Sequence, residues 1–196
     1  MDTSLSKLRS EITKLASNTS FIHHEWFATW HLEIVEQIAL ELADYYPQAN
    51  RNMVIAMVWM HDYAKIIDYN RQHDDDLVKQ GASVLIGLGF DGTFAEQVAD
   101  NIKIMDSKHE LEKSNIEVQI VSSADGCSHL VGPFFKLYWR EHPQMSVQDL
   151  LAENRRKLTV DWAQKVTLPE AKRAFKVRYK LAMEQTERPM DRYVNQ

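Results

Sequence analysis

Residues 51–65 read RNMVIAMVWMHDYAK, and this stretch indicates the fold of the whole chain. Positions 53–60 are all apolar, so a helix here would be apolar around its whole circumference. Such a helix needs other helices around it, and we therefore expect residues 51–65 to form the centre of an all-α bundle. The stretch ends abruptly on His61 and Asp62, two polar side chains that must find partners if they are buried.

The segments on either side carry the period of amphipathic helices. Apolar side chains recur every three or four positions over residues 4–17 and 31–45. Residues 116–130 predict a further helix, because their length and context favour a helix over a strand. The last helix is predicted from Pro169 to about Glu187.

Local signals predict where other helices begin and end. Acidic residues 74–76 are typical of a helix start, and Gly87 with Gly89 is typical of its end. Three pairs have the spacing of N-terminal capping boxes: Thr93 with Glu96, Ser146 with Asp149, and Thr167 with Glu170. These signals predict a multi-helix bundle joined by short loops.

The composition agrees with a helical protein of one domain. The chain has 196 residues, of which 44% are hydrophobic and 26% charged, ordinary values for a globular domain. It contains only 6 Gly and 5 Pro, which disfavours a turn-rich β-sandwich. We expect a single domain over residues 1–196, without internal repeats or long linkers.

Charge and hydropathy argue against several classes of partner. The net charge of −5 disfavours binding to a nucleic-acid duplex, and the basic residues 172–180 are typical of the solvated face of a helix. The longest apolar run, residues 53–60, is far shorter than the ~20 residues that span a bilayer. The single cysteine, Cys127, fits a reducing compartment. We therefore expect a cytoplasmic protein that does not enter the membrane, with a homodimer possible.

Four chemically active side chains lie at the ends of apolar helical stretches. His61 and Asp62 end the central helix, His31 opens an earlier helix, and Asp125 ends a later apolar run. A divalent metal ion would satisfy all four if the helices converge on one point. Two histidines with two carboxylates suit Mn, Fe, Co, Ni, Zn or Mg. For His61 and Asp62 alone, a buried hydrogen bond without a metal is the alternative.

The order of these residues resembles that of the HD-domain superfamily of metal-dependent phosphohydrolases. Residues 60–65, MHDYAK, are similar to the family's apolar-His-Asp-x-x-Lys signature. Residues 31–35, HLEIV, resemble its first motif, and residues 123–125, SAD, resemble its final Asp motif. The resemblance covers about residues 22–135 and leaves 136–196 as additional helices packed on the domain.

The resemblance implies a metal held by His31, His61, Asp62 and Asp125, and hydrolysis of a phosphate ester or anhydride, often in a nucleotide. The metal would polarise a phosphoryl oxygen and lower the pKa of a bound water. Lys65 follows Asp62 by three residues and could bind the phosphate, although a solvated lysine at a helix end has the same spacing. We expect Lys65 and Asp62 to act in catalysis on a small phosphorylated substrate.

Many members of this family hold a second metal with two further histidines, and here the pattern differs. Met105 stands where one of them is expected, and a thioether is a poor ligand for hard cations. The remaining candidates for a second metal or for substrate contacts are His73, Asp106, His109 and His129. Lone histidines in loops are mostly exposed, and His129 could simply pack between helices. Because Met105 occupies the place of a further histidine, we predict one metal site rather than two.

Two other functions fit the same pattern. A di-iron oxygenase of the HD type would need six ligands, which requires His73 together with His109 or Asp106. A non-catalytic HD fold would serve as a ligand-sensing or interaction module, and the presence of Lys65 argues mildly against it. Metal content per chain, combined with a screen of phosphorylated substrates, would separate these functions.

Overall fold

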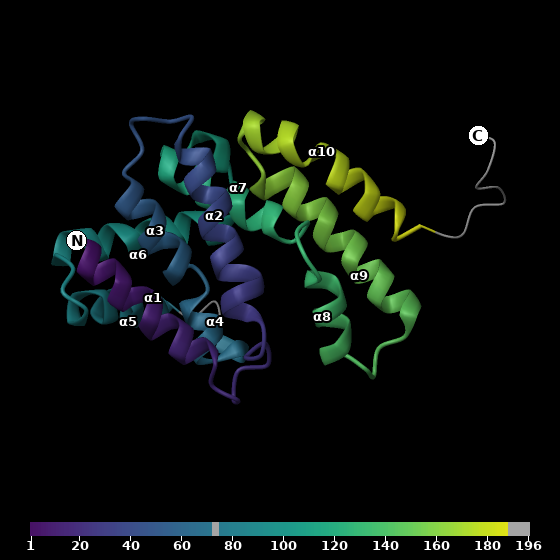
Figure 1. Ribbon diagram of the computed structural model, residues 1–196, viewed down its shortest axis with the longest axis horizontal. Coiled ribbons are helices and arrows are strands. Elements are labelled where there is room, and N and C mark those ends of the chain that lie inside the picture. Colours follow the sequence, from purple (N-terminus) through teal and green to yellow (C-terminus); the bar gives the residue numbers. More distant parts are fainter. Residues whose placement is uncertain (72–74, 188–196) are drawn as a thin grey trace.

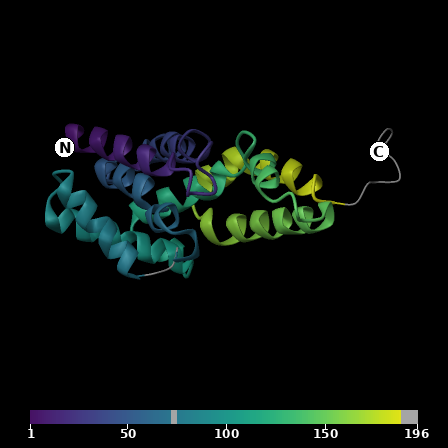
Figure 2. The same ribbon diagram turned by 90° about the horizontal axis from the view of Figure 1, so that it is seen from below.

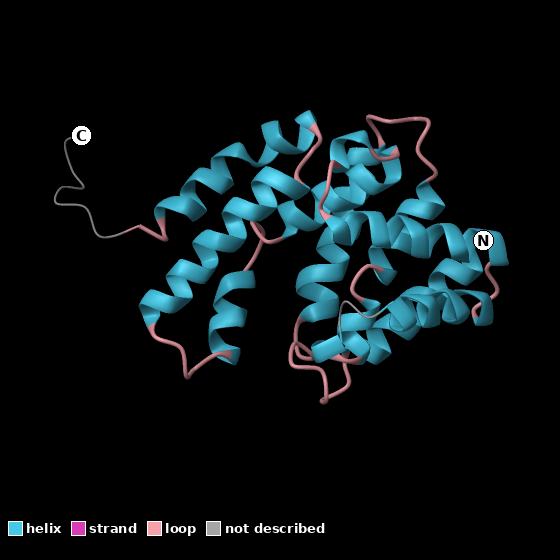
Figure 3. Cartoon of the chain, turned by 180° about the vertical axis from the view of Figure 1, so that it is seen from behind, coloured by secondary structure: helices cyan, strands magenta, loops and turns pink. Residues whose placement is uncertain are grey.

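Helices account for all the regular structure in the described part of the chain. The computed structural model describes residues 1–71 and 75–187, and these residues form no strand (Figure 3). The all-α prediction is therefore confirmed for them. In chain order the elements are α1 (Asp2–Ala16), the π-helical turn η1 (Ala28–Leu32), α2 (Glu33–Ala43), α3 (Arg51–Met60), α4 (Tyr63–Ile67), the 3₁₀ turn η2 (Tyr69–Arg71), α5 (Asp75–Gly87), α6 (Gly92–Ser107), the 3₁₀ turn η3 (Leu111–Lys113), α7 (Ile116–Ser128), α8 (Phe134–Glu141), α9 (Val147–Val160), the π-helical turn η4 (Asp161–Lys165) and α10 (Pro169–Glu184).

The helix α3 occupies the centre of the N-terminal bundle, as its apolar sequence predicts. It packs against α1, α2, α6 and α7, and the side chains of Met57 and Val58 have no exposed surface. Its start is fixed by Asn50, whose side-chain oxygen accepts hydrogen bonds from the backbone N–H groups of Asn52 at 3.1 Å and Met53 at 3.2 Å. The central helix is thus held by packing on every side and by a cap at its start.

The central helix ends at Met60, earlier than the predicted residue 65. Asp62 has a non-helical backbone (φ −107°, ψ 16°) and separates α3 from the short helix α4. It makes no capping hydrogen bond, because its carboxylate faces His31, His61 and Lys65 instead. Adjacent side chains on an unbroken helix point roughly 100° apart, so the break allows His61 and Asp62 to face the same point.

The other predicted helix ends agree only in part with the structure. The predicted helix over 116–130 is present as α7, and α5 ends at Gly87, with Gly89 in the left-handed region at φ +91°. The helix α2 ends at Ala43 instead of residue 45, and α10 ends at Glu184 instead of Glu187. Of the acidic residues 74–76, Asp74 lies outside the described residues.

Two of the three predicted capping boxes are wrong. Ser146 caps α9 as predicted, because its hydroxyl accepts the N–H of Asp149 at 3.1 Å. The cap of α6 is Asp91 rather than Thr93, since the Asp91 carboxylate accepts the N–H of Phe94 at 3.2 Å.

The helix α10 starts after Leu168 without a side-chain cap, because Thr167 lies outside the helix and Glu170 instead accepts a hydrogen bond from Tyr46 at 2.6 Å.

The helix α7 lies between the C-terminal helices and the N-terminal ones and contacts both. Figure 1 and Figure 2 show α9 and α10 side by side at one end, with α7 between them and the N-terminal helices. The turn η4 passes close to α7 at Gly126, where a Cβ atom would lie 2.9 Å from Val166 Cγ2 and 3.2 Å from Lys165 Cβ. A glycine here lets η4 approach the helix beside Asp125. None of the helices in residues 1–71 and 75–187 combines the length and the apolar character needed to cross a bilayer.

Candidate metal centre

The four predicted ligands come together where η1, the α3–α4 break and α7 meet. His31 Nε2 lies 3.3 Å from His61 Nε2, and both nitrogens lie 3.4 Å from Asp62 Oδ2. Asp125 Oδ1 lies 3.7 Å from His31 Nε2 and 3.9 Å from His61 Nε2. The side chains of His31, His61 and Asp125 are buried, whereas that of Asp62 is 21% exposed. One edge of the cluster is therefore accessible.

These spacings are close to those of a metal coordination shell. Ligand atoms bound to a metal at ~2.0–2.2 Å lie roughly 3.0–3.5 Å from their neighbours in the shell. Groups of described residues whose ligand atoms all lie within 4.8 Å of one another include His31 with His61 and Asp62, and His31 with Asp125 and His129. The buried histidines and carboxylates could therefore hold a metal ion after small adjustments.

Outer hydrogen bonds turn the Nε2 atoms of His31 and His61 toward the centre. His61 Nδ1 lies 2.7 Å from the backbone carbonyl oxygen of Val58, to which it can only donate. The Ser128 hydroxyl donates to the Asp125 backbone oxygen at 2.7 Å, so its oxygen is free to accept from His31 Nδ1 at 3.2 Å. In their neutral forms both rings then direct Nε2 lone pairs toward each other and toward the carboxylates. Lone pairs that face one another repel, and a cation between them would remove this repulsion. A hydrogen-bond partner on the other ring nitrogen is typical of metal-binding histidines.

The carboxylates of the cluster favour a positive charge on one of its two histidines. Burial opposes the protonation of His61, but the carboxylates of Asp62 and Asp125 outweigh it and raise the pKa of His61 to about 9. Burial lowers the pKa of the neighbouring His31. A divalent metal would compete with a proton for His61, because histidine binds metals in its neutral form.

Two lysines keep the ligand carboxylates ionised. Burial opposes the ionisation of Asp62, yet Lys65, with its Nζ 3.3 Å from Oδ2, and His61 hold the pKa of Asp62 well below its usual range. Burial likewise opposes the ionisation of Asp125, and Lys165 outweighs it, so the pKa of Asp125 is also well below its usual range. Lys165 Nζ lies 2.5 Å from Asp125 Oδ2, which leaves Oδ1 as the oxygen that faces the histidines.

The structure places the four secondary candidates differently. His129 is buried beside the centre, with Nε2 3.5 Å from Asp125 Oδ1, and burial lowers the pKa of its ring to about 4. Asp106 and His109 are exposed, and neither joins the described groups that could hold a metal. Met105 is buried in the core, and His73 lies outside the described residues.

Three charged residues of the C-terminal segment lie near the centre and were not anticipated from the sequence. Lys165 binds Asp125, Asp161 Oδ2 lies 2.8 Å from His129 Nδ1, and Lys157 Nζ lies 3.3 Å from Asp161 Oδ2. Their spacing of four residues was the only available signal, and it is equally typical of a solvated helix face. Asp161 and Lys165 stand in the π-helical turn η4, and such turns are frequent at functional sites.

A cavity of about 250 Å³ opens onto the centre from the side of α8 and α9. His31 and His129 line it, together with Lys65, Lys157 and the aromatic ring of Phe134. Lys157 Nζ lies 5.8 Å from the centroid of the Phe134 ring, so a cation and an apolar surface are adjacent in the wall. The cavity can therefore receive a ligand with an anionic and an apolar part.

The helix α8 is attached to the N-terminal part of the chain by Glu141. One oxygen of this carboxylate lies 2.7 Å from His23 Nδ1, and the other accepts the indole N–H of Trp26. Burial raises the pKa of Glu141 and lowers that of His23 to about 3, so the ring is neutral. His23 and Trp26, which stand in the turns before η1, thus form part of the cavity wall.

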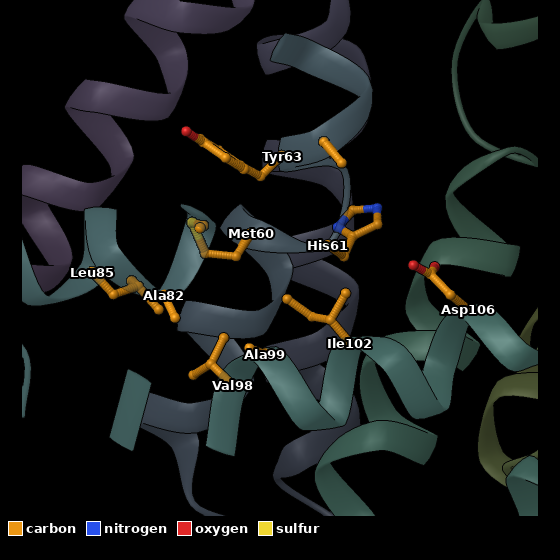
Figure 4. A pocket seen from close by; sticks show the side chains of 11 residues that line it. Met60, His61, Tyr63, Ala82, Leu85, Val98, Ala99, Ile102 and Asp106 are labelled. Carbon is orange, nitrogen blue, oxygen red and sulfur yellow. The ribbon is translucent and has the colours of Figure 1, made fainter. Parts of the chain in front are cut away.

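A second, smaller cavity is lined by His61 and not by His31. Figure 4 shows that it is lined mainly by apolar side chains such as Met60, Leu85 and Val98, with the carboxylate of Asp106 at the same end as His61. Its volume of about 20 Å³ would hold roughly one water molecule. It is too small for a substrate, so the larger cavity is the candidate binding site.

Comparison with known proteins adds no assignment of family. A scan against protein-family models, a search of curated proteins and a search of solved structures each found no match to the chain. Any function must therefore be argued from the centre and its cavity.

Proposed function

We propose that this chain is a metal-dependent phosphohydrolase of the HD-domain type that acts on a small phosphorylated metabolite. The observation that carries the proposal is the convergence of His31, His61, Asp62 and Asp125 beside a cavity that also contains Lys65. The family resemblance of these residues in the sequence and their proximity in space support the same conclusion. The central metal would be a divalent ion held at one site.

The charge balance of the centre favours an anionic substrate. The carboxylates of Asp62, Asp125 and Asp161 each lie against a lysine side chain, so the charges cancel when the histidines are neutral. A divalent metal then leaves an excess of two positive charges in a largely buried site. A phosphate group carries about −1.5 to −2 charge at neutral pH and would compensate that excess.

The groups around the cavity have distinct roles in this proposal. When bound, the metal would supply either Lewis-acid polarisation of a phosphoryl oxygen or a lower pKa for a coordinated water. Lys65 adds a fixed cation beside Asp62, where it stabilises negative charge that develops on the phosphoryl oxygens. Phe134 and its aromatic neighbours contact the remainder of the substrate and exclude water.

The size of the cavity supports a metabolite as the substrate. Its volume of about 250 Å³ lies below the ~300–1,000 Å³ of sites that bind drug-sized ligands. A single phosphorylated metabolite fits this space, whereas a nucleic-acid duplex does not.

The test is phosphate release by the metal-loaded protein. The purified chain would be loaded separately with Mn, Fe, Co, Ni, Zn or Mg and assayed on a panel of nucleotides and other phosphate esters. We expect release that depends on the metal, that is lost in Asp62→Ala and that is retained in the control Asp100→Ala, which removes an exposed carboxylate. Wild-type protein that is fully metallated and cleaves nothing on the panel would contradict the proposal and favour a sensor or an oxygenase.

A further inference from the structure

His129 lies at the C-terminal end of α7, one helical turn after Asp125, and faces the candidate metal centre. Its side chain is only 5% exposed. The ring lies parallel to that of His31, with 5.4 Å between the centroids, and it contacts the ring of Phe134 at 4.3 Å. Packing therefore fixes the plane of the His129 ring.

Hydrogen bonding fixes which nitrogen of His129 faces the centre. Nδ1 lies 2.8 Å from Oδ2 of Asp161, a buried carboxylate in η4. Two lysines lie close to Asp161, Lys157 Nζ at 3.3 Å from Oδ2 and Lys165 Nζ at 3.9 Å from Oδ1, and they favour its ionised form. An ionised carboxylate can only accept, so His129 Nδ1 donates and Nε2 carries the lone pair of the neutral ring.

That lone pair points at another acceptor. His129 Nε2 lies 3.5 Å from Asp125 Oδ1, the same oxygen that faces His31 and His61. Two acceptors in a buried contact repel each other unless a cation lies between them. The arrangement of a carboxylate, a histidine and an open Nε2 is also the usual second shell of a metal site.

The distances from His129 to two of the four predicted ligands, His31 and Asp125, allow it to join the same metal. Its ligand atom and those of His31 and Asp125 all lie within 4.8 Å of one another. For a six-coordinate ion with bonds of ~2.1 Å, adjacent ligands lie roughly 3.0 Å apart and opposite ligands roughly 4.2 Å apart. We propose that His129 is a fifth protein ligand of the metal, oriented by Asp161; this inference rests on the metal centre of the proposed function.

The consequence would be a centre with one exchangeable position. If the ion takes six ligands, five protein donors would leave one position for a water or a substrate oxygen. The residue that orients the fifth donor comes from η4, outside the segment that resembles the HD family, so the C-terminal helices complete the centre.

The test counts the histidine nitrogens bound to Mn(II) by pulsed electron paramagnetic resonance on protein with ¹⁵N-labelled histidine, without substrate. We expect three coupled nitrogens in the wild type, two in His129→Ala, and three in the control His109→Ala, whose side chain is exposed. Asp161→Asn should keep the ligand but weaken Mn(II) binding by about 10–100-fold, the usual effect of removing an outer partner.

Two coupled nitrogens in the wild type would overturn the proposal, and this count needs no variant to fold. The result is independent of turnover. If the wild type shows three coupled nitrogens but releases no phosphate, His129 is a ligand and the hydrolase proposal is wrong. If it shows two coupled nitrogens and releases phosphate, the hydrolase proposal stands and His129 is not a ligand.

Discussion

Two lysines contact the candidate ligands, and their surroundings give them different roles. Lys65 is 23% exposed, lines the larger cavity and lies 5.2 Å from the centroid of the Phe27 ring. Lys165 is 14% exposed and lies against Asp125 on the side away from the histidines. Lys65 can therefore meet a substrate, whereas Lys165 acts on the protein's own carboxylate.

The variant Lys65→Ala should retain the metal and lose turnover. An ammonium group is not a metal ligand, but it is a fixed charge beside the reacting phosphate, so we expect turnover to fall about ten- to a thousandfold. Steady-state kinetics with a measured metal content checks this. The matched control is Lys79→Ala, which removes the exposed pair of Asp76 and Lys79 at the same spacing of three residues. Equal kinetics for Lys65→Ala and wild type would move phosphate binding to another residue.

The variant Lys165→Met should lower the free energy of unfolding of the metal-free protein by about 3–5 kcal/mol. The reason is that Asp125 would be left as a buried charge without its partner. Urea denaturation measures the effect. The control Lys172→Met changes an exposed lysine on α10 and should stay within about 0.5 kcal/mol of wild type. If Lys165→Met lowers the free energy of unfolding no more than the control does, the ion pair of Lys165 with Asp125 contributes little to stability.

The candidate ligands could be predicted from the sequence, whereas their supporting residues could not. His61, Asp62 and Asp125 each follow an apolar stretch, where a polar side chain must have a partner. Asp161 and Lys165 have no such context. Their spacing suits a solvated face, and only the packing of η4 on α7 shows that they are buried.

At the scale of elements, the helices could be predicted but their irregularities could not. Both π-helical turns carry residues of the centre, with His31 in η1 and Asp161 in η4. A pattern with 3.6 residues per turn predicts ordinary helix in such segments, and it also predicts no break at Asp62. The break and the turns arise from tertiary contacts that local sequence signals do not report.

The close approach of η4 to α7 can be tested at Gly126. In Gly126→Ala the new Cβ would lie 2.9 Å from Val166 Cγ2, so η4 must shift, and we expect a loss of stability of about 1–3 kcal/mol together with weaker metal binding. Chemical denaturation and metal titration measure both effects. The control Gly92→Ala has nothing within 4 Å of the new atom and should change stability by less than about 1 kcal/mol. Similar values for the two variants would contradict the role of Gly126.

At the scale of the whole molecule, the centre joins the N-terminal helices to the C-terminal ones. Polar contacts that cross between them include His23 with Glu141, Asp125 with Lys165, and His129 with Asp161. A metal held by residues of η1, α3–α4 and α7 would draw these elements together. Metal binding should therefore resist any opening of the molecule that separates α7 from its neighbours.

Cys127 reports such opening, because it is the only cysteine of the chain and is wholly buried in α7. Burial raises the pKa of its thiol to about 12, so at pH 8 the native thiol is protonated and inaccessible. In an opened chain the pKa returns toward about 8.5, and the thiol reacts with a disulfide reagent.

Metal at about 100 times its dissociation constant should stabilise the closed state by about 2.7 kcal/mol and slow labelling about 100-fold, and a chelator should reverse the effect. Asp62→Ala lacks a ligand, so its labelling rate should not depend on metal. Labelling of the wild type at one rate with and without metal, despite measured binding, would show that the ion does not hold these helices together.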